Sequence, residues 1–343
     1  MFDINKLVRE NVRSLVPYSC ARDEFKGSEG IFMDANENPF GNLNRYPDPY
    51  QRDLKRAISR IRGIEENKIF LGNGSDEIID LSFRIFCNPG SDKALIFTPT
   101  YGMYEVSAAI NNVKIISIPL DENFQIKTTD VKPLLPDKNL KLIFICSPNN
   151  PTGNCMNNRD IERIISDFDG IVVIDEAYID FTDKPSFIKL VDKYPNLIVM
   201  QTFSKALGLA AVRVGMAFTN PEMVHYFNKM KPPYNISTIN QGTALKKLEK
   251  TGKTRDQINK IKKERERLSK KLSGLSLTEL VYPSDANFLL IKVKDADTIY
   301  KTLVNKGIVV RNRSSIVKNC LRITVGKRNE NNKLLDALTR MKI

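Results

Sequence analysis

The stretch Ile171-Val172-Val173-Ile174-Asp175-Glu176-Ala177-Tyr178 carries the pattern that decides the fold. Its first four residues are all β-branched and apolar, which predicts a strand over 171–174 that is buried on both faces of a parallel sheet. Asp175 follows this strand at once, so the strand itself places a carboxylate at the sheet edge where ligands bind in open α/β folds. A simpler alternative is that Asp175 caps the next helix.

Strand-like and helix-like segments alternate on both sides of this stretch. The other predicted strands are 68–71, 94–97, 114–118, 141–145, 197–201 and 214–218. Helical periodicity predicts helices at 75–86, 101–111 and 159–168, the first with Ser75 as its N-cap. This alternation predicts an α/β fold in which a mostly parallel seven-stranded sheet lies between helices.

The pattern changes near residue 251 and predicts a second, smaller α+β unit. A charged helix (254–275) precedes predicted strands at 286–293, 308–311 and 321–324 and predicted helices at 296–306 and 331–341. The chain has 343 residues, and single cores usually stop growing at roughly 250–300 residues. We therefore expect a large domain over 42–250 and a small domain made of 1–41 and 251–343.

Charge and hydropathy exclude several classes of protein. The net charge of +13 could indicate nucleic-acid binding. However, the densest basic stretch, 246–271, also contains acidic residues, as a solvated helix face does. No apolar run approaches the roughly 18 residues that span a bilayer, and the first seven residues lack the apolar core of a secretory signal. We expect a cytoplasmic protein that binds neither nucleic acid nor membrane.

The cysteines and the single histidine argue against a metal site. Five cysteines, none with CxxC spacing, stand at Cys20, Cys87, Cys146, Cys155 and Cys320. This usage is typical of reduced thiols in a cytosolic protein. His225 lies in a predicted helix (221–229) far from any nucleophile motif, so we expect a surface or packing role for it and no bound metal.

Four polar stretches follow predicted strands, and each has an ordinary explanation when taken alone. They are Gly72-Asn73-Gly74-Ser75-Asp76-Glu77, Ser147-Pro148-Asn149-Asn150-Pro151-Thr152-Gly153-Asn154, the Asp175 stretch, and Thr202-Phe203-Ser204-Lys205-Ala206-Leu207-Gly208-Leu209-Ala210-Ala211-Val212-Arg213. The first is a glycine turn before a helix, where backbone N–H groups can also meet a phosphate. The last holds a lysine among small and apolar residues, which is unusual.

The four stretches together resemble the fold-type I pyridoxal-phosphate aminotransferases. The asparagine, aspartate, lysine and arginine of that family's motifs match Asn150, Asp175, Lys205 and Arg213, in this order. The resemblance implies that Lys205 forms a Schiff base with pyridoxal 5′-phosphate and then moves a proton between substrate and cofactor. It implies that Asp175 pairs with the pyridinium nitrogen and keeps it protonated. With Tyr178, these are the expected catalytic residues.

The same resemblance implies the remaining cofactor contacts. The expected contacts to the ring are Tyr101, which would stack on it, and Asn150 and Tyr178, which would bond its 3′ oxygen. The expected residues around the phosphate are Gly74, Ser75, Asp76, Thr202, Ser204 and Arg213. Asp76 would contribute its N–H and not its carboxylate, which has the wrong sign, whereas Arg213 offers a rigid charged fork.

Further stretches resemble the histidinol-phosphate aminotransferases. They are Pro17-Tyr18, Ala21-Arg22, Asp34-Ala35-Asn36-Glu37-Asn38-Pro39-Phe40-Gly41, Arg45-Tyr46-Pro47-Asp48-Pro49, Pro99-Thr100-Tyr101-Gly102-Met103-Tyr104, Ala286-Asn287-Phe288, Val310-Arg311 and Leu321-Arg322-Ile323-Thr324-Val325-Gly326. This similarity implies transamination between L-histidinol phosphate and 2-oxoglutarate to give imidazole-acetol phosphate and L-glutamate, with the reverse direction serving L-histidine biosynthesis. A mild departure is Ala211-Val212, where the family often has glycine and isoleucine.

The resemblance also implies the substrate contacts. The expected substrate-binding residues are Tyr18, Asn36, Arg311 and Arg322. Arg322 would be the main receptor for a carboxylate or a phosphate, and the nearby Arg313 leaves open which of Arg311 and Arg313 meets the substrate. Tyr46 would reach across a homodimer interface to the cofactor phosphate of the neighbouring subunit.

Three alternatives remain open from the sequence. A threonine-phosphate decarboxylase would use the same lysine and aspartate but break the bond to the carboxylate. Aminotransferases for aromatic amino acids or other phosphorylated amines would share Arg322. A non-catalytic regulator on this scaffold is disfavoured, because Lys205 and Asp175 are both present and no residues are spare for a DNA-binding domain.

Overall fold

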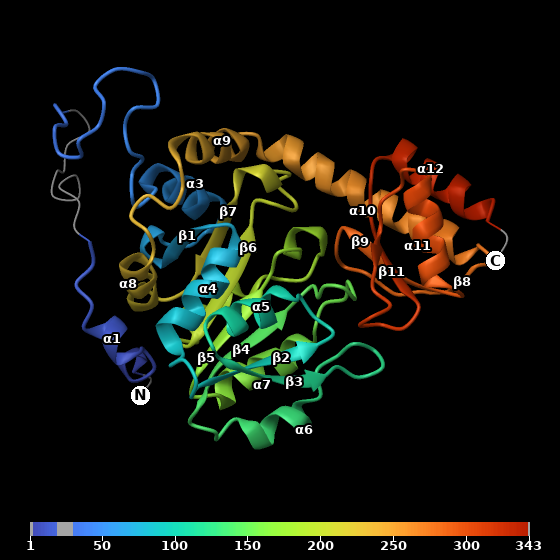
Figure 1. Ribbon diagram of the computed structural model, residues 1–343, viewed down its shortest axis with the longest axis horizontal. Helices are drawn as coiled ribbons and strands as arrows, with labels where there is room; N and C mark the ends of the chain where they lie inside the picture. Colours follow the sequence, from blue (N-terminus) through green and yellow to red (C-terminus); the bar gives the residue numbers. More distant parts are fainter. Residues whose placement is uncertain (1–2, 19–29, 342–343) are drawn as a thin grey trace.

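Two sheets organise the chain in the computed structural model, which describes residues 3–18 and 30–341 (Figure 1). Cys20 and the Ala21-Arg22 pair lie outside these residues. The larger sheet has seven strands in the order β1-β7-β6-β5-β4-β2-β3, and the smaller has four in the order β10-β11-β9-β8. The two sheets lie at opposite ends of the long helix α10 (Thr251–Ser273).

The large sheet is mostly parallel, as predicted. Its strands are β1 (Ile69–Asn73), β2 (Lys93–Thr98), β3 (Lys114–Pro119), β4 (Leu140–Cys146), β5 (Ile171–Asp175), β6 (Leu197–Thr202) and β7 (Val214–Phe218). Only β7 runs against its neighbours β1 and β6, and the other adjacent pairs are parallel. All seven predicted strands are therefore present.

Helices cover both faces of the large sheet. They are α3 (Arg52–Arg62), α4 (Ser75–Phe86), α5 (Met103–Ile110), α6 (Thr128–Val131), α7 (Asn158–Asp167), α8 (Pro221–Met230) and α9 (Thr238–Leu248). Strand β5 shows why its sequence is wholly apolar, because Val172 and Ile174 join the core on one face while Ile171 and Val173 join the core on the other. Because side chains alternate between the two faces of a strand, β5 contributes to both cores.

The beginning of the chain packs on the large sheet's side of the molecule. Ile4, Val8 and Val12, around helix α1 (Glu10–Arg13), belong to the same apolar cluster as the buried face of α4 and α8. Ile4 lies in a short 3-10 helix (Ile4–Lys6) and Val12 lies in α1, so two short helices present these side chains to the same apolar cluster. This packing differs from the grouping of residues 1–41 with the small domain, and the exact division of the chain into domains stays a prediction.

The small sheet is antiparallel throughout and packs on helices α10, α11 (Ala296–Asn305) and α12 (Arg328–Thr339). Its strands are β8 (Thr278–Val281), β9 (Phe288–Val293), β10 (Arg311–Asn312) and β11 (Cys320–Thr324). The sequence did not predict β8, because this short edge strand is half-exposed and lacks a clear alternation. No helix in the described part of the chain is long and apolar enough to cross a membrane.

Asp285 ties the small sheet to the carboxyl-terminal edge of the large one. Its Oδ2 accepts a hydrogen bond from the amide of Cys155 at 2.9 Å, and its own amide donates to the carbonyl of Gly153 at 2.7 Å. Tyr178, beyond β5, meets Phe288 of β9 edge-to-face with ring centroids 5.2 Å apart. These contacts bring β10 and β11 over the ends of β4, β5 and β6.

Candidate active site

A cavity of about 390 Å³ lies where β4, β5 and β6 end beneath the small sheet. Parallel strands end at the same edge, so the loops after them converge. The residues that line the cavity include thirteen singled out from the sequence: Ser75, Asp76, Tyr101, Asn150, Asp175, Tyr178, Thr202, Ser204, Lys205, Arg213, Arg311, Arg313 and Arg322. Residues from five separate loops and two sheets thus meet in one place.

Asp175 is a buried carboxylate held by two hydrogen-bond donors. The hydroxyl of Tyr104 donates to its Oδ2 at 2.7 Å, and the amide of Ala177 donates to its Oδ1 at 3.0 Å. Burial raises the pKa of Asp175, while these two donors and the charge of Lys205 act in the opposite direction. Burial therefore destabilises the ionised form of Asp175, and a cation bound beside it would stabilise that form.

Tyr104 is a residue of this site that the sequence did not reveal as such. It is fully buried at the start of α5, and its ring meets that of Tyr101 edge-to-face with centroids 5.6 Å apart. A buried tyrosine needs a partner for its hydroxyl. The tyrosine pair within Pro99-Thr100-Tyr101-Gly102-Met103-Tyr104 was the available signal, but only the fold shows that the second ring reaches Asp175.

The side chain of Lys205 lines the cavity and is exposed to solvent. Its Nζ lies 5.5 Å from the centre of the Tyr178 ring. Partial burial and the nearby charge of Arg322 lower the pKa of Lys205, and Asp175 opposes them. A lowered pKa increases the fraction of free amine, which is the form that attacks carbonyl groups and accepts protons.

Asn150 links the lower part of the cavity to the small sheet. Its Oδ1 accepts a hydrogen bond from Arg322 at 2.5 Å, and its Nδ2 donates to the Tyr178 hydroxyl at 3.4 Å. Arg322 also lies over the Phe288 ring, with its Cζ 5.3 Å from the ring centre. Burial raises the pKa of Tyr178, so its hydroxyl stays protonated and available as a donor.

The turn between β1 and α4 forms a tight cradle around Arg213. Gly74 has φ of +76°, and a Cβ at this position would lie 2.5 Å from a terminal nitrogen of Arg213. A Cβ on Gly215 would lie 2.4 Å from the amide nitrogen of Ser75, at the start of α4. The glycines therefore allow the arginine and the amino end of a twelve-residue helix to come together, an arrangement that suits an anion.

The carboxylate of Asp76 has a role that the sequence interpretation left out. Its Oδ2 accepts from Arg213 at 3.1 Å, and its Oδ1 accepts from the Tyr101 hydroxyl at 3.1 Å. Nearby, the guanidinium of Arg213 reaches the Ser204 hydroxyl at 3.5 Å, and the Thr202 hydroxyl accepts from the Ser204 amide at 3.1 Å. Asp76 thus fixes both Arg213 and Tyr101 in place.

Three predicted residues lie away from this cavity. Asn36 and Tyr46 line a separate cavity of about 350 Å³ near α9. The Tyr46 ring stacks on that of Tyr234 with centroids 4.4 Å apart. Tyr18 is 75% exposed. The chain by itself therefore does not bring these three residues to Lys205.

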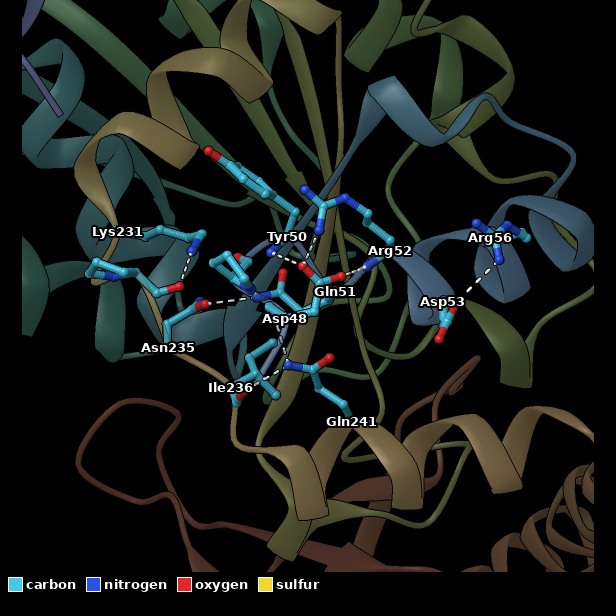
Figure 2. Close-up of polar contacts among 12 residues, drawn as sticks. Asp48, Tyr50, Gln51, Arg52, Asp53, Arg56, Lys231, Asn235, Ile236 and Gln241 are labelled. Atoms are coloured by element: carbon cyan, nitrogen blue, oxygen red, sulfur yellow. Dashed lines mark hydrogen bonds and ion pairs between the residues drawn. The ribbon is translucent and has the colours of Figure 1, made fainter. Parts of the chain in front are cut away.

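At its base, the segment that precedes α3 is held by contacts with the loop before α9 and with α9 itself (Figure 2). Asp48 accepts from the amides of Tyr50 and Arg52 at 3.0 and 2.7 Å, which starts helix α3. Gln51 is buried in a left-handed conformation and bonds the Asn235 side chain at 3.2 Å. The position of Tyr46 is thus tied to the body of the molecule.

Comparison with known proteins defines the class of this site. The family model of the class I and II aminotransferases matches residues 24–338, so the chain belongs to that family. The fold agrees, since a histidinol-phosphate aminotransferase from Clostridium acetobutylicum superimposes with a TM-score of 0.80 at 28% identity, over 87% of this chain and 90% of that one.

Within this family the chain belongs with the histidinol-phosphate aminotransferases. The proteins of that name from Cytophaga hutchinsonii and Parabacteroides distasonis are 50% and 51% identical to it. The first match covers 98% of this chain and 99% of the relative, and the second covers 100% of both. A relative from Sinorhizobium meliloti, solved in complex with pyridoxal-5′-phosphate, shares the fold with a TM-score of 0.78 at 23% identity, over 89% of each chain.

Proposed function

We propose that the protein transfers an amino group between L-histidinol phosphate and 2-oxoglutarate, giving imidazole-acetol phosphate and L-glutamate, and that it works in reverse in L-histidine biosynthesis. The observation that carries the proposal is the sequence identity of 50% and 51% with two histidinol-phosphate aminotransferases, over 98% and 100% of this chain. The cavity supports it, because it joins a lysine, a buried aspartate and a group of arginines.

The residues of the cavity fit pyridoxal 5′-phosphate as the cofactor. The Gly74 turn, which a Cβ would fill, leaves an anion site between Arg213 and the start of α4. Asp175 lies within the same cavity as Lys205 and carries the charge that a pyridinium nitrogen requires. When bound, this cofactor supplies an electron sink for charge that develops at the substrate α-carbon.

The side chains have distinct roles in this proposal. Lys205 would hold the cofactor and, as a free amine, would carry the proton at the substrate α-carbon. Asn150 and Tyr178 would form hydrogen bonds with the cofactor, and Tyr101 would pack against it. Arg322 and Arg311 orient the anionic group of each substrate, because guanidinium groups bind both carboxylate and phosphate.

The active protein is proposed to be a homodimer in which Tyr46 completes the cofactor-phosphate site of the other subunit, while Tyr18 and Asn36 contribute near the substrate. The arm before α3 supports this arrangement, since Ile31, Met33 and Phe40 are 92%, 89% and 82% exposed. Exposed apolar side chains in one segment mark a surface that another chain covers. The four described cysteines are free and buried, which supports a cytoplasmic setting.

A half-reaction tests the proposed function. The purified protein with its cofactor is mixed with L-histidinol phosphate alone, and the absorbance of the bound cofactor is followed. We expect the absorbance band to disappear and to return when 2-oxoglutarate is added. In a second cuvette, release of CO₂ from phosphothreonine without any response to L-histidinol phosphate would move the enzyme to the decarboxylase alternative.

A further inference from the structure

Arg313 lies beside the arginines proposed for the substrate and is not assigned a role in the proposed reaction. Its side chain lines the cavity together with Arg311 and Arg322. Its Nε is buried, and no hydrogen-bond acceptor for it exists among the described residues. A buried donor without an acceptor destabilises the folded chain, yet this side chain is placed beside two other arginines at the cavity.

The backbone around Arg313 fixes the direction of its side chain. Arg311 of β10 lies opposite Arg322 of β11. The amide of Arg313 donates to the carbonyl of Cys320 at 2.8 Å, which continues the pairing of the two strands. Because side chains alternate along an extended strand, Arg311 and Arg313 lie on the same face. The small sheet therefore presents two guanidinium groups from one strand and a third from the next.

The three arginines together carry more positive charge than their surroundings neutralise. Within the described residues none of the three forms an ion pair, whereas Arg213 at the other end of the cavity pairs with Asp76 at 3.1 Å. Burial and the neighbouring Arg322 and Arg311 lower the pKa of Arg313, because like charges repel. An anion with two charges neutralises this group better than an anion with one.

We propose that Arg313 is a specificity-determining residue that binds the phosphate dianion of the phosphorylated substrate and contributes little to the carboxylate substrate. This inference rests on the proposed function, in which one cavity accepts both substrates in turn. A carboxylate offers two oxygens, which two arginines can satisfy. A phosphate monoester offers a third oxygen and a second charge, which the third guanidinium can meet.

The experiment compares two variants of Arg313 with a matched control. Arg313→Gln removes the charge, and Arg313→Lys keeps the charge but loses the planar fork. Lys318→Gln removes one positive charge from an exposed position in the same β10–β11 connection, outside the cavity lining. Both half-reactions are measured for each holoenzyme, with melting temperatures to verify folding.

We expect Arg313→Gln to raise the KM for L-histidinol phosphate about tenfold while the KM for L-glutamate changes less than about threefold, with kcat little altered. Arg313→Lys should recover part of the loss, and Lys318→Gln should match the wild type. Equal losses for both substrates, or no loss for either, would overturn the assignment of Arg313.

A second readout separates this inference from the proposed function. Inorganic phosphate is titrated into each holoenzyme by calorimetry, and we expect its Kd to rise about tenfold in Arg313→Gln and to stay unchanged in Lys318→Gln. If the wild type does not respond to L-histidinol phosphate, the proposed function fails, and the phosphate titration still decides the role of Arg313. Unchanged phosphate binding in Arg313→Gln would overturn the inference by itself.

Discussion

Both ends of the cavity bear arginines, but in the described part of the chain only one end has a carboxylate that pairs with its arginine. At the end built by the large sheet, Arg213 is held by Asp76 and enclosed by the Gly74 turn. At the end built by the small sheet, Arg322 bonds only the neutral side-chain oxygen of Asn150 within the described residues. The first end suits an anion that stays bound, such as a cofactor phosphate. The second suits anions that bind and dissociate in each turnover, because no carboxylate among the described residues neutralises its positive charge.

Removing Lys205, which lies between the two ends, should separate chemistry from anion binding. Lys205→Ala is expected to lower turnover by roughly 10³-fold or more, because both the covalent link and the mobile base are lost. Binding of the cofactor phosphate and of substrate should persist, since Arg213 and Arg322 remain. Single-turnover absorbance and equilibrium dialysis measure the two properties. Turnover near the wild-type rate would contradict the central role of Lys205.

Removing Arg322 should damage the substrate end alone. For Arg322→Ala we expect kcat/KM to fall about 10²-fold with both L-histidinol phosphate and L-glutamate, because each presents an anion to the same partly buried guanidinium. Cofactor affinity, measured by fluorescence titration, should change little. A loss confined to one substrate would show that the two substrates do not share this receptor.

A methyl group at Gly74 should damage the cofactor end alone. In Gly74→Ala the added Cβ would lie 2.5 Å from Arg213, which must move away from the anion site. We expect cofactor affinity to fall about tenfold, with substrate KM values little changed in the loaded enzyme. Gly63→Ala is the matched control, since Gly63 also has a positive φ, of +68°, but faces open space. If both variants behave alike, backbone strain and not the cradle explains the effect.

The sequence predicted the parts of this comparison that depend on local pattern. Helix α4 has the predicted bounds, and β5 ends within one residue of its prediction, because apolar periodicity is a local signal. The predicted N-cap of α4 is wrong, since Gly74 and not Ser75 precedes the helix and no side chain among the described residues caps it. Strand β8 was missed since an exposed edge strand carries no such signal. The bond from Tyr104 to Asp175 joins residues 71 positions apart, so only the assembled sheet reveals it.

The separation of the arm from the cavity is a second feature that the sequence could not give. A motif near Tyr46 resembles the family, but resemblance does not specify which subunit's site a side chain completes. In the structure Tyr46 stacks on Tyr234, away from Lys205. The geometry of such a contact depends on the second copy, whose position is not encoded in any local pattern of this chain.

The smallest expected effect concerns Asp175, the negative charge between the two positive ends. Unlike Arg213, it is held by neutral donors, chiefly the Tyr104 hydroxyl at 2.7 Å. Burial raises the pKa of Asp175, so in the cofactor-free protein its contribution to stability is greatest at acid pH and is lost as the pH rises through the folded-state pKa. Tyr104→Phe removes a donor to the ionised form and raises that pKa further.

We therefore expect cofactor-free Tyr104→Phe to be less stable than the wild type by about 1–2 kcal/mol at neutral pH, with a deficit that shrinks as the pH falls. Cofactor affinity at pH 8 should drop about threefold, because the carboxylate is then less readily available to a pyridinium. Urea unfolding across pH and fluorescence titration measure these effects. Tyr226→Phe is the control, since it removes a hydroxyl that bonds Asn5 at 2.5 Å, far from the cavity. A deficit that is independent of pH would assign Tyr104 to packing, and the charge between the two ends would then depend on the Ala177 amide and Lys205 alone.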